Sequence, residues 1–180
     1  MDEPKSPAAV GEKPDKRRTP PSGDRRTNFR LMPEGFVPDF DQVTAVCTVA
    51  FTPEGMIVAC EEERGPDLPG GHVQEGEESA EQTARREADE EAGIKFGAMH
   101  FLRAIESDRY GTAPNDLTYM VIMAAIVSEQ GPVPSGMTRH IMTDEQFLAN
   151  QPSSYLRQGI LPTLLEAARK LLFPNPNRNK

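Results

Sequence analysis

The sequence predicts an α/β or α+β fold, in which strands and helices pack in layers around one hydrophobic core. Of its 180 residues, 37% are hydrophobic and 27% are charged, a composition typical of a globular domain. Segments rich in β-branched residues are interspersed with segments that carry helix-capping signals. Elements intermixed in this way indicate a layered domain, and the length leaves room for one domain and a tail.

Residues 42–63, QVTAVCTVAFTPEGMIVACEEE, predict two strands joined by a turn at TPEG, with order beginning near Phe36. In this hairpin Cys47 and Cys60 are opposite each other, so we expect two neighbouring thiols that act as small apolar side chains. Further strands are expected at 100–108 and 117–129, on either side of an exposed turn.

Three helices are predicted from their capping residues. Ser79 and Gln82 indicate a capping box at the start of a helix over 80–92, which Gly93 ends. A second box predicts a short helix over 144–150, and the last helix is expected to begin near Pro162. That helix has an apolar stripe typical of core packing, formed by Leu164, Leu165, Ala168, Leu171 and Leu172.

The charge distribution separates a basic tail from an acidic body. The net charge is −8, but residues 1–30 carry +3, which leaves −11 for the remainder. We expect a disordered basic tail over 1–28, one domain over 29–174 and a frayed C-terminus over 175–180. The body is a poor binder of nucleic acid, so only the tail offers a nucleic-acid signal.

No stretch approaches the roughly 20 apolar residues of a membrane span, and the N-terminus lacks the apolar core of a secretory signal. We therefore expect a cytoplasmic protein with no membrane partner. A homodimer is left open.

The stretch from Gly70 to Gly93, GGHVQEGEESAEQTARREADEEAG, holds the strongest functional signal. Glu87, Glu90 and Glu91 are helical i,i+3 and i,i+4 neighbours, so their carboxylates converge on one turn. Crowded carboxylates need either wide solvation or a cation, and oxygen ligands favour Mg²⁺ or Mn²⁺. The pattern therefore favours a divalent metal site on this helix.

This stretch resembles the Nudix box, whose pattern is G, five residues, E, seven residues, then R-E-apolar-x-E-E-x-G-apolar. Residues 86–94, READEEAGI, match its second half without a gap. Gly71 to Glu77 has the family spacing, but Glu77 to Arg86 is one residue too long, whereas Glu78 reverses the mismatch. We place the insertion in the QEGEE loop and leave open which glutamate, Glu77 or Glu78, has the role of the loop glutamate.

The resemblance implies an α/β/α sandwich with a mixed β-sheet that hydrolyses a pyrophosphate bond in a nucleoside diphosphate linked to another group. Glu90 and Glu91 would bind Mg²⁺, or Mn²⁺, and the carbonyl of Gly70 or Gly71 would complete the shell. Glu87 would be a ligand or the base that takes a proton from water. Arg86 would orient Glu87. A base from outside the box is the alternative, with four candidates: Glu106, Asp108, Asp116 and Glu145.

The substrate implied is a nucleotide, with a nucleoside triphosphate or a dinucleoside polyphosphate favoured. Family members that act on ADP-ribose commonly carry a proline about fifteen residues past the box, which this chain lacks. Tyr110, 16 residues after Ile94, is a weak candidate for stacking on a base. One alternative is a nucleotide-sensing module that keeps the fold without turnover. Another makes the basic tail the functional part.

Overall fold

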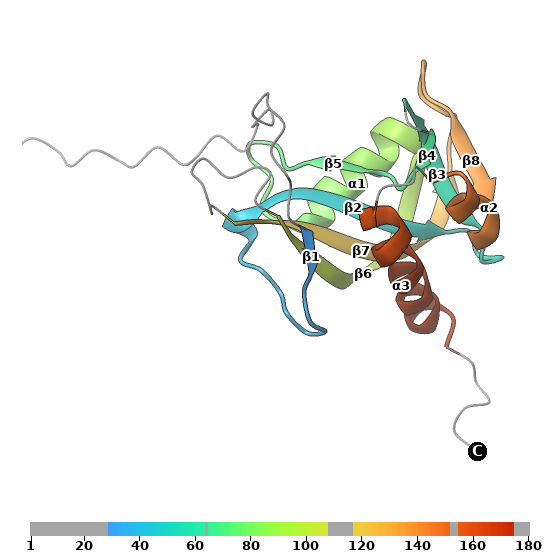
Figure 1. Cartoon of the computed structure of the whole chain (residues 1–180). Coiled ribbons are helices and arrows are strands. Elements are labelled where there is room, and N and C mark those ends of the chain that lie inside the picture. Colours follow the sequence, from blue (N-terminus) through green and yellow to red (C-terminus); the bar gives the residue numbers. More distant parts are fainter. Residues whose placement is uncertain (1–28, 64, 108–116, 152–154, 175–180) are drawn as a thin grey trace, which may run out of the picture.

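The computed structural model describes residues 29–63, 65–107, 117–151 and 155–174, and it shows a β-sheet between helices (Figure 1). Helix α1 lies on one face of the sheet and α3 on the other, which gives the expected α/β/α sandwich. In chain order the elements are β1 (Phe29–Leu31), the 3-10 turn η1 (Phe40–Gln42), β2 (Val43–Phe51), β3 (Ile57–Glu62), β4 (Gly65–Asp67), β5 (Gly70–His72), α1 (Ala80–Ala92), β6 (Ile94–Ser107), β7 (Thr118–Gln130), β8 (Arg139–Met142), α2 (Asp144–Ala149) and α3 (Tyr155–Leu172).

The sheet is mixed, as predicted. Its strand order is β1-β6-β7-β2-β3-β4, with β5 paired to β2 and β8 paired to β3. Strands β2 and β7 are parallel over Val43–Phe51, whereas the other pairs are antiparallel. The short β5 pairs with the first half of β2. Gly70 and Gly71, which belong to β5 and are called the glycine loop below, are therefore fixed to the middle of the sheet just before α1.

Helix α1 approaches the sheet closely because its buried side is made of small residues. Ala84, Ala88 and Ala92 have at most 1% of their surface exposed and pack against valines of the sheet. These positions recur every four residues, so they form one face of the helix. The carboxylates at positions 87, 90 and 91 are consequently on a helix whose distance from the sheet is fixed by the close contacts of these alanines.

The C-terminal end of α1 is held by Gly93 and Arg139. Gly93 has a left-handed φ of 60°, and its N–H donates to carbonyls of the last turn. A Cβ at this position would collide with the Pro132 carbonyl oxygen. The Arg139 guanidinium, from β8, donates to the carbonyl oxygens of Ala92 at 2.8 Å and Gly131 at 3.1 Å. A cation at this end also suits the helix dipole.

Helix α3 covers the opposite face, where Leu161, Leu164, Leu165 and Ala168 join the largest core cluster. It begins at Tyr155 rather than near Pro162, so the prediction of its start was wrong. Proline removes one backbone donor, but packing of the helix on the sheet outweighs that loss.

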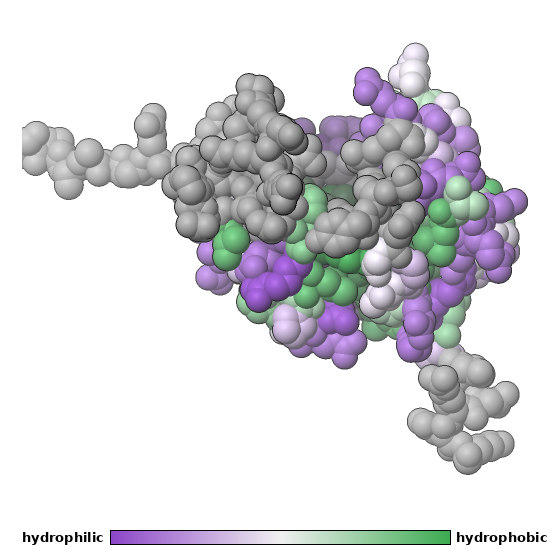
Figure 2. All heavy atoms as spheres, viewed as in Figure 1, coloured by the Kyte–Doolittle hydropathy of each residue, from purple (hydrophilic) through white to green (hydrophobic). Residues whose placement is uncertain are grey.

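Leu171 is 43% exposed and does not belong to the buried stripe, contrary to expectation. Figure 2 shows this side of the molecule, with hydrophilic residues toward the rim and hydrophobic residues visible near the centre.

The register of the first hairpin differs from the prediction by one residue. Phe51 pairs with Ile57, because Thr52 and Met56 close a turn one residue longer than TPEG. A slip of one residue moves side chains to the other face of a sheet. Cys60 therefore faces α1, whereas Cys47 packs on the α3 side and pairs with Gly70. The expectation of neighbouring thiols was wrong.

Two further boundaries and one capping box differ from the prediction. Ordered structure is present before Phe36, because β1 (Phe29–Leu31) pairs with the end of β6. Strand β6 begins at Ile94, six residues earlier than predicted. The capping box at Thr143 is confirmed. Ser79 caps α1 as expected, but the Gln82 side chain accepts from the N–H of Glu78 instead of closing the box.

The predicted tail (1–28) and C-terminus (175–180) lie outside the described residues. Among the helices that are described, none has the length and apolar character needed to cross a membrane.

We predict that Gly93→Ala lowers the free energy of unfolding by about 2–3 kcal/mol, because it adds φ strain and a contact with Pro132. Gly136 is the matched control: its φ is 85°, but a Cβ there meets no atom within 4 Å. Gly136→Ala should cost about 1 kcal/mol, from φ strain alone. Urea unfolding followed by circular dichroism measures both variants, and equal losses would show that the Pro132 contact contributes nothing.

Candidate active site

The loop between β5 and α1 is organised by Glu77. One carboxylate oxygen of Glu77 accepts from the N–H of Gln74 and from the hydroxyl of Thr83, both at 2.7 Å. The other accepts from Arg86 at 2.8 Å. Glu77 has 13% of its side chain exposed, whereas Glu78 points into solvent. The structure thus places Glu77, and not Glu78, against the helix.

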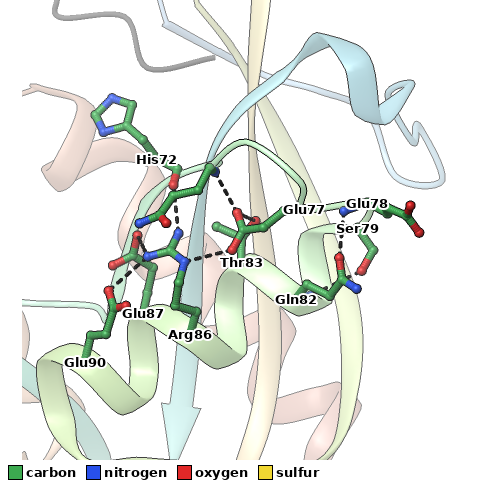
Figure 3. Close-up of polar contacts among 10 residues, drawn as sticks. His72, Glu77, Glu78, Ser79, Gln82, Thr83, Arg86, Glu87 and Glu90 are labelled. Atoms are coloured by element: carbon green, nitrogen blue, oxygen red, sulfur yellow. Dashed lines mark hydrogen bonds and ion pairs between the residues drawn. The ribbon is translucent and has the colours of Figure 1, made fainter. Parts of the chain in front are cut away.

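The guanidinium of Arg86 is the centre of the cluster (Figure 3). Besides Glu77, it contacts Glu87 Oε1 at 2.7 Å and Glu90 Oε2 at 3.0 Å, and it donates to the His72 carbonyl at 2.9 Å. Its side chain is only 19% exposed. The burial of this charge is compensated because each of the three guanidinium nitrogens donates to at least one acceptor.

Glu87 is buried against the glycine loop. Its carboxylate occupies the position that a Cβ on Gly71 would fill, so any other residue at 71 would displace it. Gly70 makes a similar close approach to the backbone of Val46 and Cys47. Both glycines are therefore required for close packing, in addition to the carbonyl role that the sequence predicts for them.

Glu91 is held by Gly70 and by the neighbouring strand β3. Its Oε2 accepts from the Gly70 N–H at 2.9 Å and from the Cys60 thiol at 3.4 Å. The Cys60 sulfur and carboxylate oxygens of Glu62 and Glu91 all lie within 4.8 Å of one another. Glu90, by contrast, is 56% exposed and faces solvent beyond Arg86.

Burial and hydrogen bonds shift the pKa values of three glutamates of the site in different directions. Desolvation raises the pKa of Glu87, and the repulsion from Glu90 adds to it, against the lowering effect of Arg86. Desolvation also raises the pKa of Glu91, helped by repulsion from Glu87 and Glu62. Burial alone would raise the pKa of Glu77 too, but the hydrogen bonds from Arg86, Gln74 and Thr83 lower it overall.

The hydrogen bonds described above leave one oxygen of each helix carboxylate without a partner in the described part of the chain. Arg86 holds one oxygen of Glu87 and one of Glu90, while Gly70 and Cys60 hold one oxygen of Glu91. The second oxygen of each carboxylate has no hydrogen-bond partner among the described residues. Mg²⁺ and Mn²⁺ prefer oxygens of this kind. Among the described residues, however, the group of three potential ligands that lies within 4.8 Å is Cys60, Glu62 and Glu91, and it does not include Glu87 and Glu90.

The candidate bases outside the box are only partly described. Glu106 is engaged elsewhere, because it pairs with Arg30 at 2.8 Å and accepts from the Tyr119 hydroxyl. Glu145 accepts from the Thr143 hydroxyl at the start of α2. Asp108, Tyr110 and Asp116 lie outside the described residues.

Sequence reasoning did not identify Cys60 or Glu62 as part of this site. Their i,i+2 spacing on a strand just before the glycine loop was the available signal, since alternate residues share a face. The expected register had placed Cys60 on the wrong side of the sheet. Thr83, which fixes Glu77, was also missed.

A family model describes this architecture: the NUDIX domain matches residues 41–150, more than half of the chain. The chain belongs to the Nudix family. It is accordingly a hydrolase that acts on pyrophosphate bonds, in a family that generally uses divalent metal ions.

Solved structures of Nudix proteins share the fold. The pyrophosphohydrolase BsRppH of Bacillus subtilis has a TM-score of 0.60 at 19% identity, over 83% of this chain and 93% of that one. A MutT protein from Aliivibrio salmonicida or Vibrio cholerae has a TM-score of 0.51 at 19% identity, over 69% and 97%. The Nudix domain of Shewanella oneidensis NrtR, crystallised with ADP-ribose, has 0.53 at 20%, over 78% and 93%. No curated protein sequence matches the chain.

We predict that Glu77→Gln is damaging and Glu78→Gln is neutral. Glu77 accepts hydrogen bonds with both oxygens, and an amide would turn a donor toward either Arg86 or Thr83. We expect Glu77→Gln to lower stability by about 1–3 kcal/mol and turnover about tenfold. Glu78→Gln should stay within about 0.5 kcal/mol of the wild type. Thermal melts and steady-state rates test this, and the opposite ranking would assign the loop role to Glu78.

We also predict that Glu91→Gln raises the melting temperature of the metal-free protein at pH 8, by on the order of 2 °C. Because the folded pKa of Glu91 is raised, its ionised form destabilises the native state above that pKa. As the pH falls toward about 4.3, the pKa of a glutamate in the unfolded state, Glu91 becomes neutral in the wild type. The difference in melting temperature between the two proteins should then vanish. Melts in chelator at pH 8 and at about pH 4, just below the unfolded-state pKa, measure this. A lower melting temperature for Glu91→Gln at pH 8 would contradict the electrostatic account.

Proposed function

We propose that the protein is a Mg²⁺-dependent hydrolase of a nucleoside triphosphate or a dinucleoside polyphosphate. The observation that carries the proposal is the set of three carboxylates on one turn of α1, Glu87, Glu90 and Glu91, each with one oxygen held by a hydrogen bond and the other without a hydrogen-bond partner among the described residues. An acidic body of this kind repels a polyphosphate unless a cation lies between them. Bound Mg²⁺, or Mn²⁺, would neutralise the phosphate oxygens and lower the pKa of the attacking water.

Each residue of the cluster has a distinct task in this proposal. Glu90 and Glu91 hold the metal, with a carbonyl of the Gly70–Gly71 loop. Arg86 keeps Glu87 in place through a 2.7 Å contact and does not bind substrate. Glu87, buried and with a raised pKa, is either a third ligand or the base that accepts the proton of the water. Loss of metal binding in Glu87→Gln would indicate a ligand, and loss of turnover alone would indicate the base.

Two neighbours bear on the substrate class in different ways. BsRppH is described as a pyrophosphohydrolase, which agrees with cleavage of a terminal pyrophosphate bond. The NrtR domain was crystallised with ADP-ribose, and it supports the alternative of a nucleotide-sensing module. Retention of all three carboxylates, together with their ordered contacts, favours turnover over sensing. The domain that carries this activity would be residues 29–174.

The test is a substrate panel on the full chain, in Mg²⁺ and in chelator. It compares nucleoside triphosphates including oxidised ones, dinucleoside polyphosphates, nucleotide sugars and ADP-ribose, and scores phosphate and pyrophosphate release. We expect metal-dependent cleavage of a triphosphate or a dinucleoside polyphosphate.

Glu90→Gln should lower that activity by more than about a hundredfold, exceeding the 10–100-fold effect of residues that only orient ligands. Glu81→Gln is the control, since Glu81 pairs only with Arg85 at the exposed start of α1. Binding of nucleotide without cleavage of any substrate would support the sensing module instead.

A further inference from the structure

Cys60 is the one buried thiol that reaches the acidic cluster among the described residues. Its side chain is 1% exposed on β3, and its sulfur lies 3.4 Å from Glu91 Oε2. The same thiol lies 3.5 Å from the carbonyl oxygen of Asp67. Glu91 Oε2 also accepts from the Gly70 N–H at 2.9 Å. Two donors from different elements therefore converge on one oxygen of Glu91.

We propose that Cys60 is a positioning residue for metal binding: with Gly70 it fixes Oε2 of Glu91, so that Oε1 is directed at the cation. This inference rests on the proposed function, in which Glu91 is a metal ligand. Residues that orient a ligand from behind are commonly worth 10–100-fold in metal affinity. Cys60 does not bind the metal or the substrate in this account.

The backbone around Cys60 is rigid enough for this role. Cys60 pairs with Asp67 of β4 on one side and with Arg139 of β8 on the other, so its strand position is fixed from both edges. Arg139 in turn donates to the carbonyl of Ala92, at the end of the helix that carries Glu91. Cys60 and the helix that carries Glu91 are therefore connected through Arg139 of β8, in addition to their direct contact.

The chemistry of a thiol suits a carboxylate that must also bind a metal. A thiol is a weak donor, so it orients Glu91 while leaving more electron density on the carboxylate than a strong donor would. It is also a small apolar side chain, which suits the burial of this position. Cys47 provides the contrast, because it lies on the other face of the sheet, where its sulfur is 3.6 Å from the sulfur of Met120.

The test is Mn²⁺ binding to the full chain, measured by electron paramagnetic resonance without substrate. Cys60→Ala and Cys60→Val both remove the donor, one with loss of volume and the other with gain. We expect both to weaken Mn²⁺ binding about tenfold. Cys60→Ser, which restores a donor, should bind within about threefold of the wild type, and Cys47→Ala should bind as the wild type does.

Steady-state rates give a second readout. The Mg²⁺ concentration for half-maximal turnover should rise about tenfold in Cys60→Ala, while kcat at saturating metal changes less than about threefold. A merely structural role would lower the melting temperature without this separation. If one donor-free variant does not fold, the other carries the comparison, and Cys60→Ser remains the rescue.

Two outcomes would overturn the proposal. One is Mn²⁺ binding by folded Cys60→Ala or Cys60→Val that equals the wild type. The other is a sulfur-to-metal charge-transfer band in the Co²⁺-loaded wild type that Cys60→Ser removes, because it would make Cys60 a ligand. Glu91→Gln separates this failure from failure of the proposed function. Unchanged Mn²⁺ binding in Glu91→Gln would refute the metal role of Glu91 itself.

Discussion

The guanidinium of Arg86 is the contact on which the site depends, because it joins three parts of the chain that would otherwise repel one another. It bridges the loop at Glu77, the β5 carbonyl of His72 and two carboxylates of its own helix. Like charges at helical neighbour spacing destabilise a helix by a few tenths of a kcal/mol per pair. The buried guanidinium of Arg86 among these carboxylates turns the repulsion into net attraction. It also fixes which oxygen of Glu87 and of Glu90 is left without a hydrogen-bond partner among the described residues.

Close packing by residues without large side chains makes this arrangement precise. The alanine face of α1 sets the distance of the helix from the sheet, and Gly71 leaves the space that the Glu87 carboxylate occupies. Small residues here do not give flexibility. They bring backbone and carboxylate together, and the strands on either side keep them there, as a ligand set for a metal requires.

The site is arranged for function at some expense to stability. Glu87 and Glu91 are partly desolvated, and their raised pKa values show that the metal-free fold disfavours their ionised forms. Glu77 is different, because its donors more than offset its burial and lower its pKa. The hydrogen bonds of Glu77 thus favour its ionised form, whereas burial disfavours the ionised forms of Glu87 and Glu91. Such a division is common where a native structure holds charge for chemistry.

The sequence by itself determined the helix over 80–92 and the placing of Glu87, Glu90 and Glu91 on one of its turns, because these follow from local spacing and capping. Its resemblance to the Nudix box implied the family and, with it, the mixed α/β/α architecture. The sequence could not decide between Glu77 and Glu78, because the inserted residue lets each glutamate match one of the two spacings of the family pattern and miss the other. Only the fold shows that Glu77, and not Glu78, contacts Arg86 and Thr83. It also brought Cys60 to Glu91, because one extra residue in the hairpin turn reversed the face of a strand, and strand register is settled by pairing and burial across the sheet.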